Sequence, residues 1–319
     1  MNKAYRVSAT SLILIVLLST PTYAWNNRGH MMVAAVAYRQ LNQQTRNRVD
    51  ALLLLNPDRP NWLSLIPQGT PAAKRKMMLF MIAATWPDRI KGDSQYHSDG
   101  PNDGNTPPDD PSASQNIGYD DLARHKYWHF INVPFTQDNT PLPTVVSPNA
   151  KTQLTAFRAV LASTTSSDKL KSYDLSWLLH LVGDLHQPLH CTARVSAANP
   201  KGDAGGNFVK LNGALDNLHS FWDGIIGGGN EEDPVPAANV AATLPAAPPG
   251  AAADLNVQHW IQQGVDLAKT MVYVNPPIGK SSGPFTTTSV YRNNARKLVK
   301  RRIALGGARL AKILNNELK

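Results

Sequence analysis

The pattern of apolar residues constrains the fold of this chain more than any other feature of its sequence. Apolar residues recur at helical spacing along most of the chain, whereas the alternation that is typical of half-buried strands is scarce. One segment, 175–187, is apolar on nearly all sides, as a buried helix would be. We therefore expect an all-α protein. The predicted helices are 29–41, 74–84, 152–161, 175–187, 217–225, 258–272 and 291–318.

The first 24 residues have the features of a signal peptide. Lys3 and Arg6 precede a continuous apolar run over 12–18, and small residues follow just before Trp25. This run is too short to span a bilayer. We expect cleavage after Ala24, which leaves 319 − 24 = 295 residues. The mature chain would then be secreted or periplasmic, in a bacterium.

Composition excludes several protein classes. Hydrophobic residues make up 42% of the chain, which argues against disorder. Cys191 is the only cysteine, so no internal disulfide can form despite the predicted export. No later apolar run is long enough for a membrane anchor, and we expect a soluble protein. The net charge of +9 becomes +9 − 2 = +7 after cleavage and suits a polyanionic partner.

Two long segments lack helical spacing. Residues 92–118 are rich in Asp, Asn, Gly and Pro, and a loop of this length is usually functional or mobile. Residues 227–253 are rich in Gly, Pro and Ala, and we expect this insertion to pack little and to be flexible. Neither segment separates two cores, so the sequence predicts one domain over 25–319.

The densest group of chemically active residues ends at His190. His180 and Asp184 are four residues apart, so both side chains leave the same face of one helix. His219 and Asp223 repeat this spacing. Imidazole nitrogen and carboxylate oxygen are ligands that zinc prefers. One such pair is more often a buried histidine with a hydrogen-bonded partner, but two pairs together with His190 favour a site for several zinc ions.

Further ligand-type residues lie upstream. After cleavage, Trp25 would offer a free α-amine and its carbonyl to a metal, and His30 follows five residues later. Asp88 follows a predicted helix end, and His129 lies in a segment that we expect to be extended up to Pro134. Taken singly, these residues are more typical of a mobile terminus, a capping carboxylate and a core histidine.

These residues belong to short motifs that occur in one order along the chain. The motifs are Trp25 to Gly29-His30, Trp86-x-Asp88, His129-Phe130-Ile131, the run from His180 to His190, Gly205-Gly206-Asn207, Asn217-Leu218-His219-x-x-Trp222-Asp223 and Ala308-Arg309-Leu310-Ala311. Each motif alone is weak, but together they resemble the S1/P1 nuclease family of zinc-dependent nucleases. The resemblance covers essentially the whole mature chain. It implies a single, mainly helical domain of the type shared with zinc phospholipase C.

The resemblance also implies a centre of three zinc ions. Its ligands would be Asp88, His129, His180 and Asp184 for one zinc, His190, His219 and Asp223 for a second, and the amine and carbonyl of Trp25 with His30 for a third, which Asp184 would bridge to the first. His186 is left over, and we expect a structural role for it. His97, His125 and His259 match no family position, and we expect them on the surface.

Other residues match positions at which the family contacts its substrate. Lys91, three residues after Asp88, matches a basic residue near the phosphate, although a solvated loop lysine is an equal alternative. Phe130 is either a base-stacking aromatic or a core residue. Asn132 stands where an aspartate is common, and this leaves base preference open because an amide both donates and accepts. Asn207 matches a residue at the site that faces the phosphate or supports the ligands.

The activity that the resemblance implies is hydrolysis of phosphodiester bonds. The substrates would be single-stranded DNA, RNA and nucleotides, the products would have 5′-phosphates, and a 3′-nucleotidase activity is possible. Asp88, Asp184 and Lys91 would be the catalytic residues. The main alternative is a zinc phospholipase C or phosphomonoesterase, since that family shares the fold, and a remote one is a zinc-binding protein without activity. The basic cluster at 296–302 is more simply a solvated helix face than a nucleic-acid patch.

Overall fold

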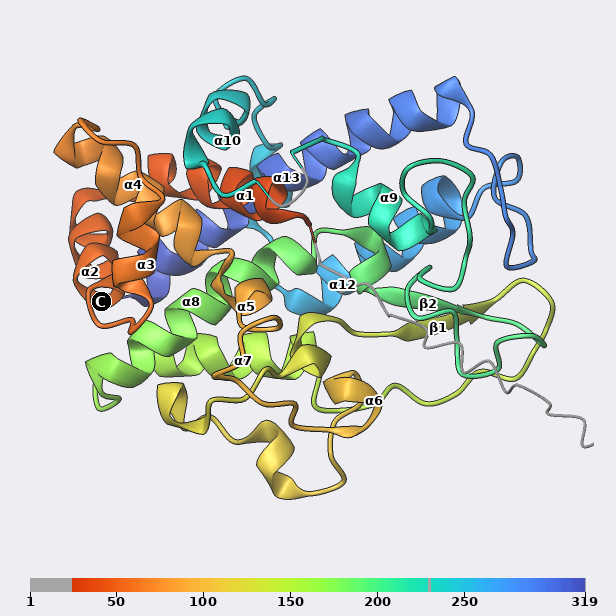
Figure 1. Cartoon of the computed structure of the whole chain (residues 1–319), viewed down its shortest axis with the longest axis horizontal. Helices are drawn as coiled ribbons and strands as arrows, with labels where there is room; N and C mark the ends of the chain where they lie inside the picture. The colour runs from red at the N-terminus through yellow and green to blue at the C-terminus, as the bar shows by residue number, and fades with distance from the viewer. Residues whose placement is uncertain (1–24, 229–230, 319) are drawn as a thin grey trace, which may run out of the picture.

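Helix α8, Asp168–Asp184, runs through the centre of the molecule in the computed structural model, which describes residues 25–228 and 231–318 (Figure 1). Every residue of α8 from Lys171 onward is buried, as its apolar sequence predicts. The helix begins seven residues before the predicted start at 175. Its first turns contain Ser172 and Asp174, whose polar side chains are buried with partners and therefore hide the helical pattern.

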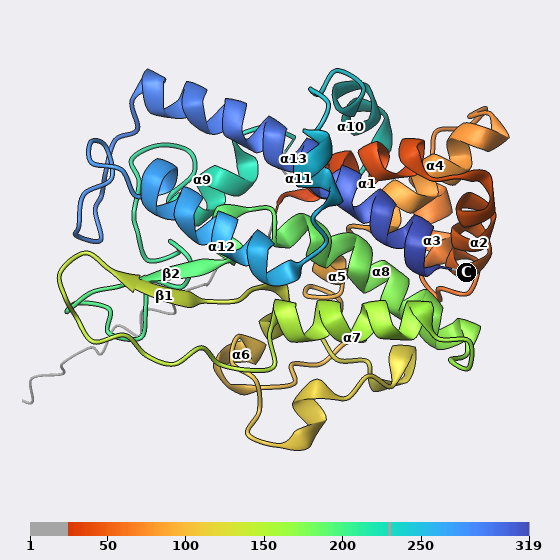
Figure 2. The same cartoon turned by 180° about the vertical axis from the view of Figure 1, so that it is seen from behind.

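Three other helices surround α8. Helix α1, Asn27–Gln40, and helix α13, Ser289–Glu317, lie together on one side of it, and α7, Ala150–Ala162, packs along the other (Figures 1 and 2). The approach of α13 to α1 depends on Gly307, because a Cβ there would lie 2.5 Å from the Cβ of Val36. Among the described residues no helix is both long and apolar enough to cross a membrane.

The predicted helices other than α8 begin and end within two residues of the observed ones, except that the predicted helix 258–272 is divided into α12 and the turn η5. Shorter elements fill the space between them. The remaining elements are α2, Gln43–Leu53; α3, Arg59–Ser64; α4, Ala72–Ala83; α5, Trp86–Arg89; α6, Pro101–Gly104; α9, Leu218–Gly224; α10, Pro234–Ala241; α11, Pro249–Ala253; α12, Val257–Leu267; the 3₁₀ turns η1, Pro111–Ser114, η2, Gly118–Asp121, η3, Lys126–His129, and η4, Pro188–His190; the π-helical turn η5, Ala268–Val272; and strands β1, Val133–Thr136, and β2, Thr192–Val195. The all-α prediction is confirmed, with one small sheet added. The predicted signal peptide lies outside the described residues.

The sheet joins two segments that follow predicted metal ligands. Strands β1 and β2 are parallel, and Val133 pairs with Thr192. The backbone N–H of Ile131 donates to the carbonyl of His190 at 2.8 Å, so the chain after His129 lies against the chain around His190. The expectation of an extended segment from His129 to Pro134 is wrong at both ends. His129 ends a 3₁₀ turn, and Pro134 lies inside β1.

The insertion 227–253 packs more than its composition suggests. Pro234 starts α10, which packs against α1 and buries Ala237 and Ala238. The guanidinium of Arg39 donates to the carbonyl of Ala238 at 2.9 Å. Alanine is the best helix former and proline is favoured in the first turn, so a composition that resembles a loop also allows short helices. The expectation that the segment packs little is therefore wrong, while its flexibility stays a prediction.

Candidate metal centre

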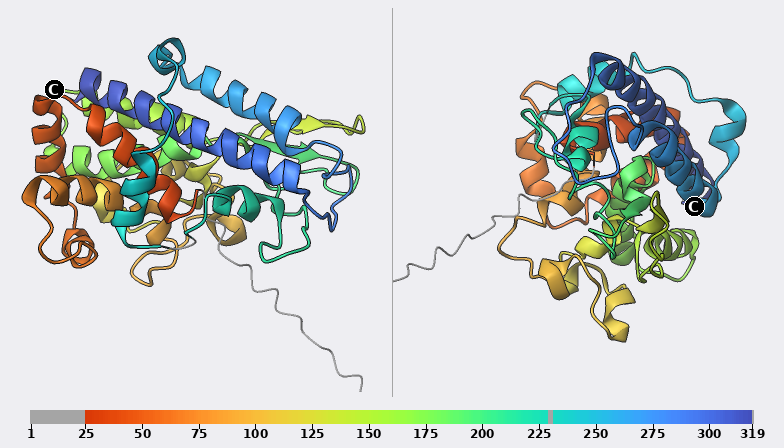
Figure 3. Two further views of the ribbon diagram at one scale, coloured as in Figure 1. Left: turned by 90° about the horizontal axis from the view of Figure 1, so that it is seen from above. Right: turned by 90° about the vertical axis from the view of Figure 1, so that its right-hand side faces the viewer.

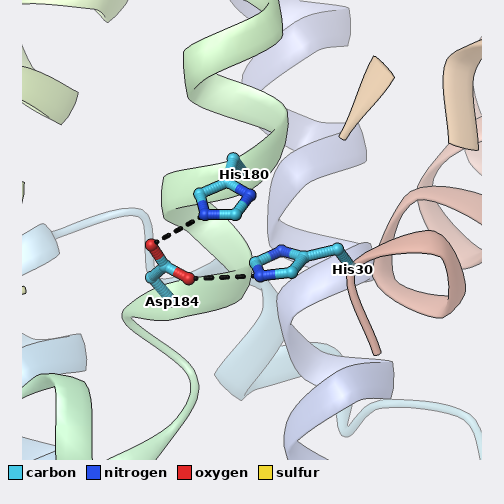
Figure 4. Close-up of side chains that lie close together, drawn as sticks. All are labelled: His30, His180 and Asp184. Atoms are coloured by element: carbon cyan, nitrogen blue, oxygen red, sulfur yellow. Dashed lines mark ion pairs between the residues drawn. The ribbon is translucent and has the colours of Figure 1, made fainter. Parts of the chain in front are cut away.

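The carboxylate of Asp184 lies between imidazoles from two helices. His180 and Asp184 leave the same face of α8 one turn apart, and His30 comes from the first turn of α1. The rings of His30 and His180 stack with centroids 3.8 Å apart. Asp184 Oδ1 is 3.4 Å from His30 Nε2, and Oδ2 is 3.3 Å from His180 Nε2 (Figure 4). The helical spacing thus positions three ligand-type side chains around one point.

A glycine allows this close approach of α1 to α8. A Cβ on Gly183 would lie 2.8 Å from His30 Nδ1, so the ring occupies the space of the absent side chain. The indole N–H of Trp25 donates to the carbonyl of Gly183 at 2.9 Å, and the indole is fully buried. Trp25 is thereby fixed next to His30, at the end of α8 that contains Asp184.

Two more ligand-type residues complete this group. Asp88 lies in the single turn of α5, and His129 ends η3. His129 Nδ1 is 3.3 Å from Asp184 Oδ2, and His180 Nε2 is 3.6 Å from Asp88 Oδ1. Ligand atoms of Asp88, His129 and His180 lie within 4.8 Å of one another. The ammonium of Lys91 donates to Asp88 Oδ1 at 2.6 Å and is nearly buried, so Lys91 is not the solvated lysine of the alternative interpretation.

A separate group forms where α8 ends and the chain turns. Helix α8 ends at Asp184, four residues before Pro188, and η4 then places His190 near His219 and Asp223 of α9. The rings of His190 and His219 are 4.9 Å apart, and His219 Nε2 is 3.4 Å from Asp223 Oδ2. The ligand atoms of these three residues also lie within 4.8 Å of one another.

Backbone carbonyls fix the tautomers of three histidines. A carbonyl only accepts hydrogen bonds, so an imidazole Nδ1 that contacts one must have the proton. Nε2 is then unprotonated and can bind a metal, as in many zinc sites. In His180 this nitrogen lies 2.9 Å from His129 Nδ1. The contacts run from His180 Nδ1 to Ala84 O at 2.8 Å, from His190 Nδ1 to His129 O at 2.8 Å, and from His219 Nδ1 to Gly205 O at 2.7 Å.

Buried polar atoms without hydrogen-bond partners gather at these groups. They include His30 Nδ1 and Nε2, Asp88 Oδ2, His129 Nε2, Asp184 Oδ1 and Oδ2, and His190 Nε2. Buried polar atoms in proteins nearly always have partners, and an unpaired buried carboxylate is costly. Cations between the side chains would satisfy these atoms, so the donor set fits metal ions.

The protonation equilibria of four of the predicted ligand histidines agree with this interpretation. Burial lowers the pKa of His30, His129 and His190 well below the usual value, and it lowers the pKa of His219 to about 4. These imidazoles are therefore neutral near pH 7 and keep a lone pair. Burial raises the pKa of Asp184 to about 6, because the anion has lost its hydration. A nearby cation would restore the charged form.

The structure brings together every side chain of the predicted ligand set. The three groups are His30, His180 and Asp184; Asp88, His129 and His180; and His190, His219 and Asp223. His180 and Asp184 lie between the first two groups, and Trp25 lies beside them. The individual ligand roles stay predictions.

The three predicted substrate residues are all partly buried. Phe130 is partly buried and packs against the core, and Asn132 is also partly buried. The amide of Asn207 donates from Nδ2 to the carbonyl of Ala204 at 2.7 Å, while its Oδ1 is buried without a partner. Their roles in binding stay predictions.

His186 lies outside the metal-ligand groups. Its Nδ1 donates to the carbonyl of Val182 at 2.7 Å, and its Nε2 accepts from Arg309 of α13 at 2.9 Å. These contacts join the end of α8 to α13. This arrangement agrees with the structural role expected from the sequence.

The surface prediction holds for two of the three unmatched histidines. His97 and His259 are exposed. His125 is buried, which corrects the prediction for this residue. Its ring nitrogens lie 2.6 Å from an oxygen of Asp99 and 2.9 Å from one of Asp121, because the loop before it folds back over the ring.

Two supporting residues have no role in the sequence interpretation. Gln187 donates from Nε2 to Asp223 Oδ1 at 2.8 Å and so orients that carboxylate. Asp203 accepts from the backbone N–H of Gly206 at 3.0 Å and from the hydroxyl of Tyr273 at 2.9 Å, which fixes the loop that precedes Asn207. Gln187 lies between the predicted ligands Asp184 and His190 in the sequence, and this position could have indicated a supporting role. Asp203 has no spacing to the predicted ligands that could have indicated its role.

Fold and site together define a helical protein whose buried histidines and aspartates are arranged to bind metal ions. The S1/P1 Nuclease family matches residues 25–319. The chain belongs to this family.

Three relatives of this chain are named as nucleases. Nuclease S1 of Aspergillus oryzae is 26% identical over 235 residues, a match of 70% of this chain and 60% of that protein. Endonuclease 3 of Arabidopsis thaliana is 24% identical over 339 residues, covering 99% of this chain and 96% of the relative. Endonuclease 2 of the same plant is 24% identical over 228 residues, covering 70% and 64%. The similarity is distant, and the chain spans 60% of Nuclease S1.

Proposed function

We propose that this protein is an exported, zinc-dependent nuclease. It hydrolyses phosphodiester bonds of single-stranded DNA and RNA to products with 5′-phosphates, and it removes the 3′-phosphate of nucleotides. The observation that supports this most directly is the cluster of buried imidazole and carboxylate atoms without partners, in a chain of the S1/P1 family. The family and the names of the relatives support nucleic acid as the substrate.

The residues present suit three zinc ions. Their nitrogen and oxygen donors are those that zinc prefers, and the tautomers set by backbone carbonyls leave Nε2 unprotonated. Asp184, with one oxygen toward His30 and the other toward His180, is placed to be shared by two ions. The holding residues would be Asp88, His129, His180 and Asp184; His190, His219 and Asp223; and Trp25, His30 and Asp184.

Hydrolysis would then depend on positioned charges around the phosphate. Zinc ions supply positive charge that makes water more acidic and offsets negative charge on phosphate oxygens. Asp88 and Asp184 would hold the ions in position, and both carboxylates are themselves shielded from bulk water. Lys91, fixed by Asp88, is close enough to the ligands to donate a hydrogen bond to a phosphate oxygen.

Three residues around the ligands would contact the rest of the substrate. Phe130, next to His129, would stack on a base, a contact that tolerates any sequence. Asn132 would face the base edge with both a donor and an acceptor. Asn207 would use its unpaired Oδ1 as an acceptor near the His219 ring, which contacts the same loop at Gly205.

A zinc phospholipase C or phosphomonoesterase is the alternative that the experiment must separate. The purified mature protein is assayed on single-stranded DNA, on RNA and on phosphatidylcholine, before and after treatment with a chelator and again after zinc is restored. We expect cleavage of both nucleic acids, loss of activity with the chelator and recovery with zinc. Hydrolysis of phosphatidylcholine without cleavage of nucleic acid would contradict the proposal.

A further inference from the structure

Four cations form an exposed face on the N-terminal half of α13. Arg296, Lys297, Lys300 and Arg301 are all exposed, and we call them the basic face. Arg302, the last cation of this run in the sequence, is buried instead and donates to the carbonyl of His186 at 3.0 Å. Of the five cations in the cluster expected from the sequence, four are therefore exposed.

Helical geometry separates the basic face from the packed side of α13. Tyr291, Ala295 and Val299 are buried at intervals of one turn and face the rest of the molecule. Successive residues rotate by about 100° in a helix, so 296, 297, 300 and 301 occupy the opposite half. In Figures 1 and 3 this part of α13 runs along the outside of the molecule.

The basic face has no balancing carboxylates. Helix α13 contains no Asp or Glu before Glu317. Within 25–228 and 231–318, the ion pairs of the protein involve none of the four cations, and Arg296 makes only a hydrogen bond to Asn293. A helix face that is only solvated typically mixes both signs, and like charges one turn apart weaken a helix. The charge of this face therefore favours an anionic partner.

The basic face lies on the helix that supports a metal-ligand element. The indole N–H of Trp222 in α9 donates to the hydroxyl of Tyr291 at 3.0 Å, and the rings of Phe221 and Tyr291 are 5.7 Å apart. Helix α9 also contains His219 and Asp223. The basic face is on the opposite side of α13 from Tyr291, so a polymer bound there would lie about 10 Å, one helix diameter, from α9.

We propose that the basic face binds the phosphate backbone of a long nucleic-acid strand outside the cleavage site. This inference rests on the proposed function and adds a second region of contact with the same substrate. The exposed groups of this face are ammonium and guanidinium, so the contact would be independent of sequence and sensitive to salt. Its effect would be to hold the polymer near the metal centre between successive cleavages.

The test compares two variants that lose the same charge. The first replaces Arg296, Lys297, Lys300 and Arg301 by glutamine, which keeps helix propensity. The control replaces four exposed cations elsewhere: K74Q, R75Q, K201Q and K312Q. Both zinc-loaded proteins are assayed on poly(dT) and on the dinucleotide TpT at several salt concentrations, and circular dichroism checks that both are folded.

We expect a selective effect on the polymer. For the basic-face variant, KM on poly(dT) rises about tenfold and the dependence of log KM on log salt falls by about 0.7 for each lost contact, with kcat unchanged. Its kinetics on TpT and both activities of the control stay within about twofold of the parent protein. A poly(dT) KM that is unchanged, or that rises equally in the control, would overturn the inference.

Two further arms test for a membrane contact and for failure of the proposed function. If the parent protein binds vesicles of equal parts phosphatidylcholine and phosphatidylglycerol through these four residues, while the poly(dT) KM of the variant is unchanged, the face contacts membranes and the inference is wrong. If the zinc-loaded parent cleaves neither TpT nor poly(dT), the proposed function fails. Fluorescence anisotropy with labelled poly(dT) then still decides whether the basic face binds the polymer.

Discussion

Asp184 contacts imidazoles from three separate elements, with His30, His129 and His180 all within 3.4 Å of its oxygens. Both oxygens are buried and lack hydrogen-bond donors. Asp223 differs, because its Oδ1 accepts from Gln187 and only the His190 and His219 group includes it. These two carboxylates should therefore differ in how many zinc ions depend on them.

The first prediction compares these two carboxylates. D184A should lose the two zinc ions that share this residue and retain about one, whereas D223A should retain about two. Elemental analysis of the purified, folded variants measures this directly. Activity should be lowest in D184A. Equal zinc contents in the two variants would contradict the bridging role of Asp184.

Gln187 provides the second prediction at this scale. Because its amide fixes the orientation of Asp223, Q187L should weaken zinc binding at the group that contains His190 by about 10–100-fold. Zinc affinity is measured by competition with a chelator of known affinity. Q187E is the informative companion, since a second carboxylate cannot donate to Asp223 and would repel it. Zinc binding equal to that of the parent protein in both variants would show that Gln187 does not position the carboxylate.

At the scale of elements, the sequence predicts which ligand-type side chains share a helix face better than it predicts how the surrounding segments pack. His180 and Asp184, like His219 and Asp223, are one helical turn apart, and that spacing alone places each pair on one face. The packing of Ala237 in α10 left no such signal, because the many glycines and prolines of 227–253 hide the short helices that its alanines form.

The burial of His125 was also invisible from its neighbours in sequence. One ring nitrogen contacts Asp99, which is 26 residues away in the sequence. Contacts of this kind depend on how a long loop returns to the core, and local patterns do not encode that path. Spacing within one helix predicts which ligand-type side chains lie together, whereas contacts between loops require the structure.

His125 fixes the loop before it to the turn that contains His129. Burial opposes protonation of its ring, but hydrogen bonds to Asp121 and Asp99 outweigh burial and raise the pKa of His125. The groups that face it are Asp99, Asp121, Tyr127, Trp128 and Trp177. The charged ring therefore stabilises the folded state.

The third prediction follows from the sign of this shift. A raised pKa means that the stabilisation is complete below the unfolded value of about 6.5 and is lost as pH rises through the higher folded value. H125Q should lower the melting temperature of the zinc-loaded protein more at about pH 6 than at about pH 9. H97Q, at an exposed histidine, is the control. A destabilisation that is the same at both pH values would exclude the charged form.

For the whole molecule, the position of Trp25 connects the predicted export with the proposed metal binding. The indole of Trp25 is fixed on Gly183, beside His30, and both ring nitrogens of His30 are buried without partners. Removal of residues 1–24 would turn the backbone nitrogen of Trp25 from an amide, which is a poor ligand, into a free amine. Cleavage would thereby complete the ligand set of the third zinc at the mature terminus.

The last prediction is that the uncleaved or extended chain binds two zinc ions firmly and the third weakly, because metal affinity follows the number of available deprotonated ligands. Three forms are refolded with excess zinc: the mature chain, the mature chain with one added N-terminal residue, and the mature chain with a C-terminal tag. The first and third should be fully active, and the extended form should be impaired and lose its third zinc first on dilution. This would keep the enzyme inactive until export and protect nucleic acid where the chain is made. Full activity and three firmly bound zinc ions in the extended form would show that Trp25 contributes only its packing.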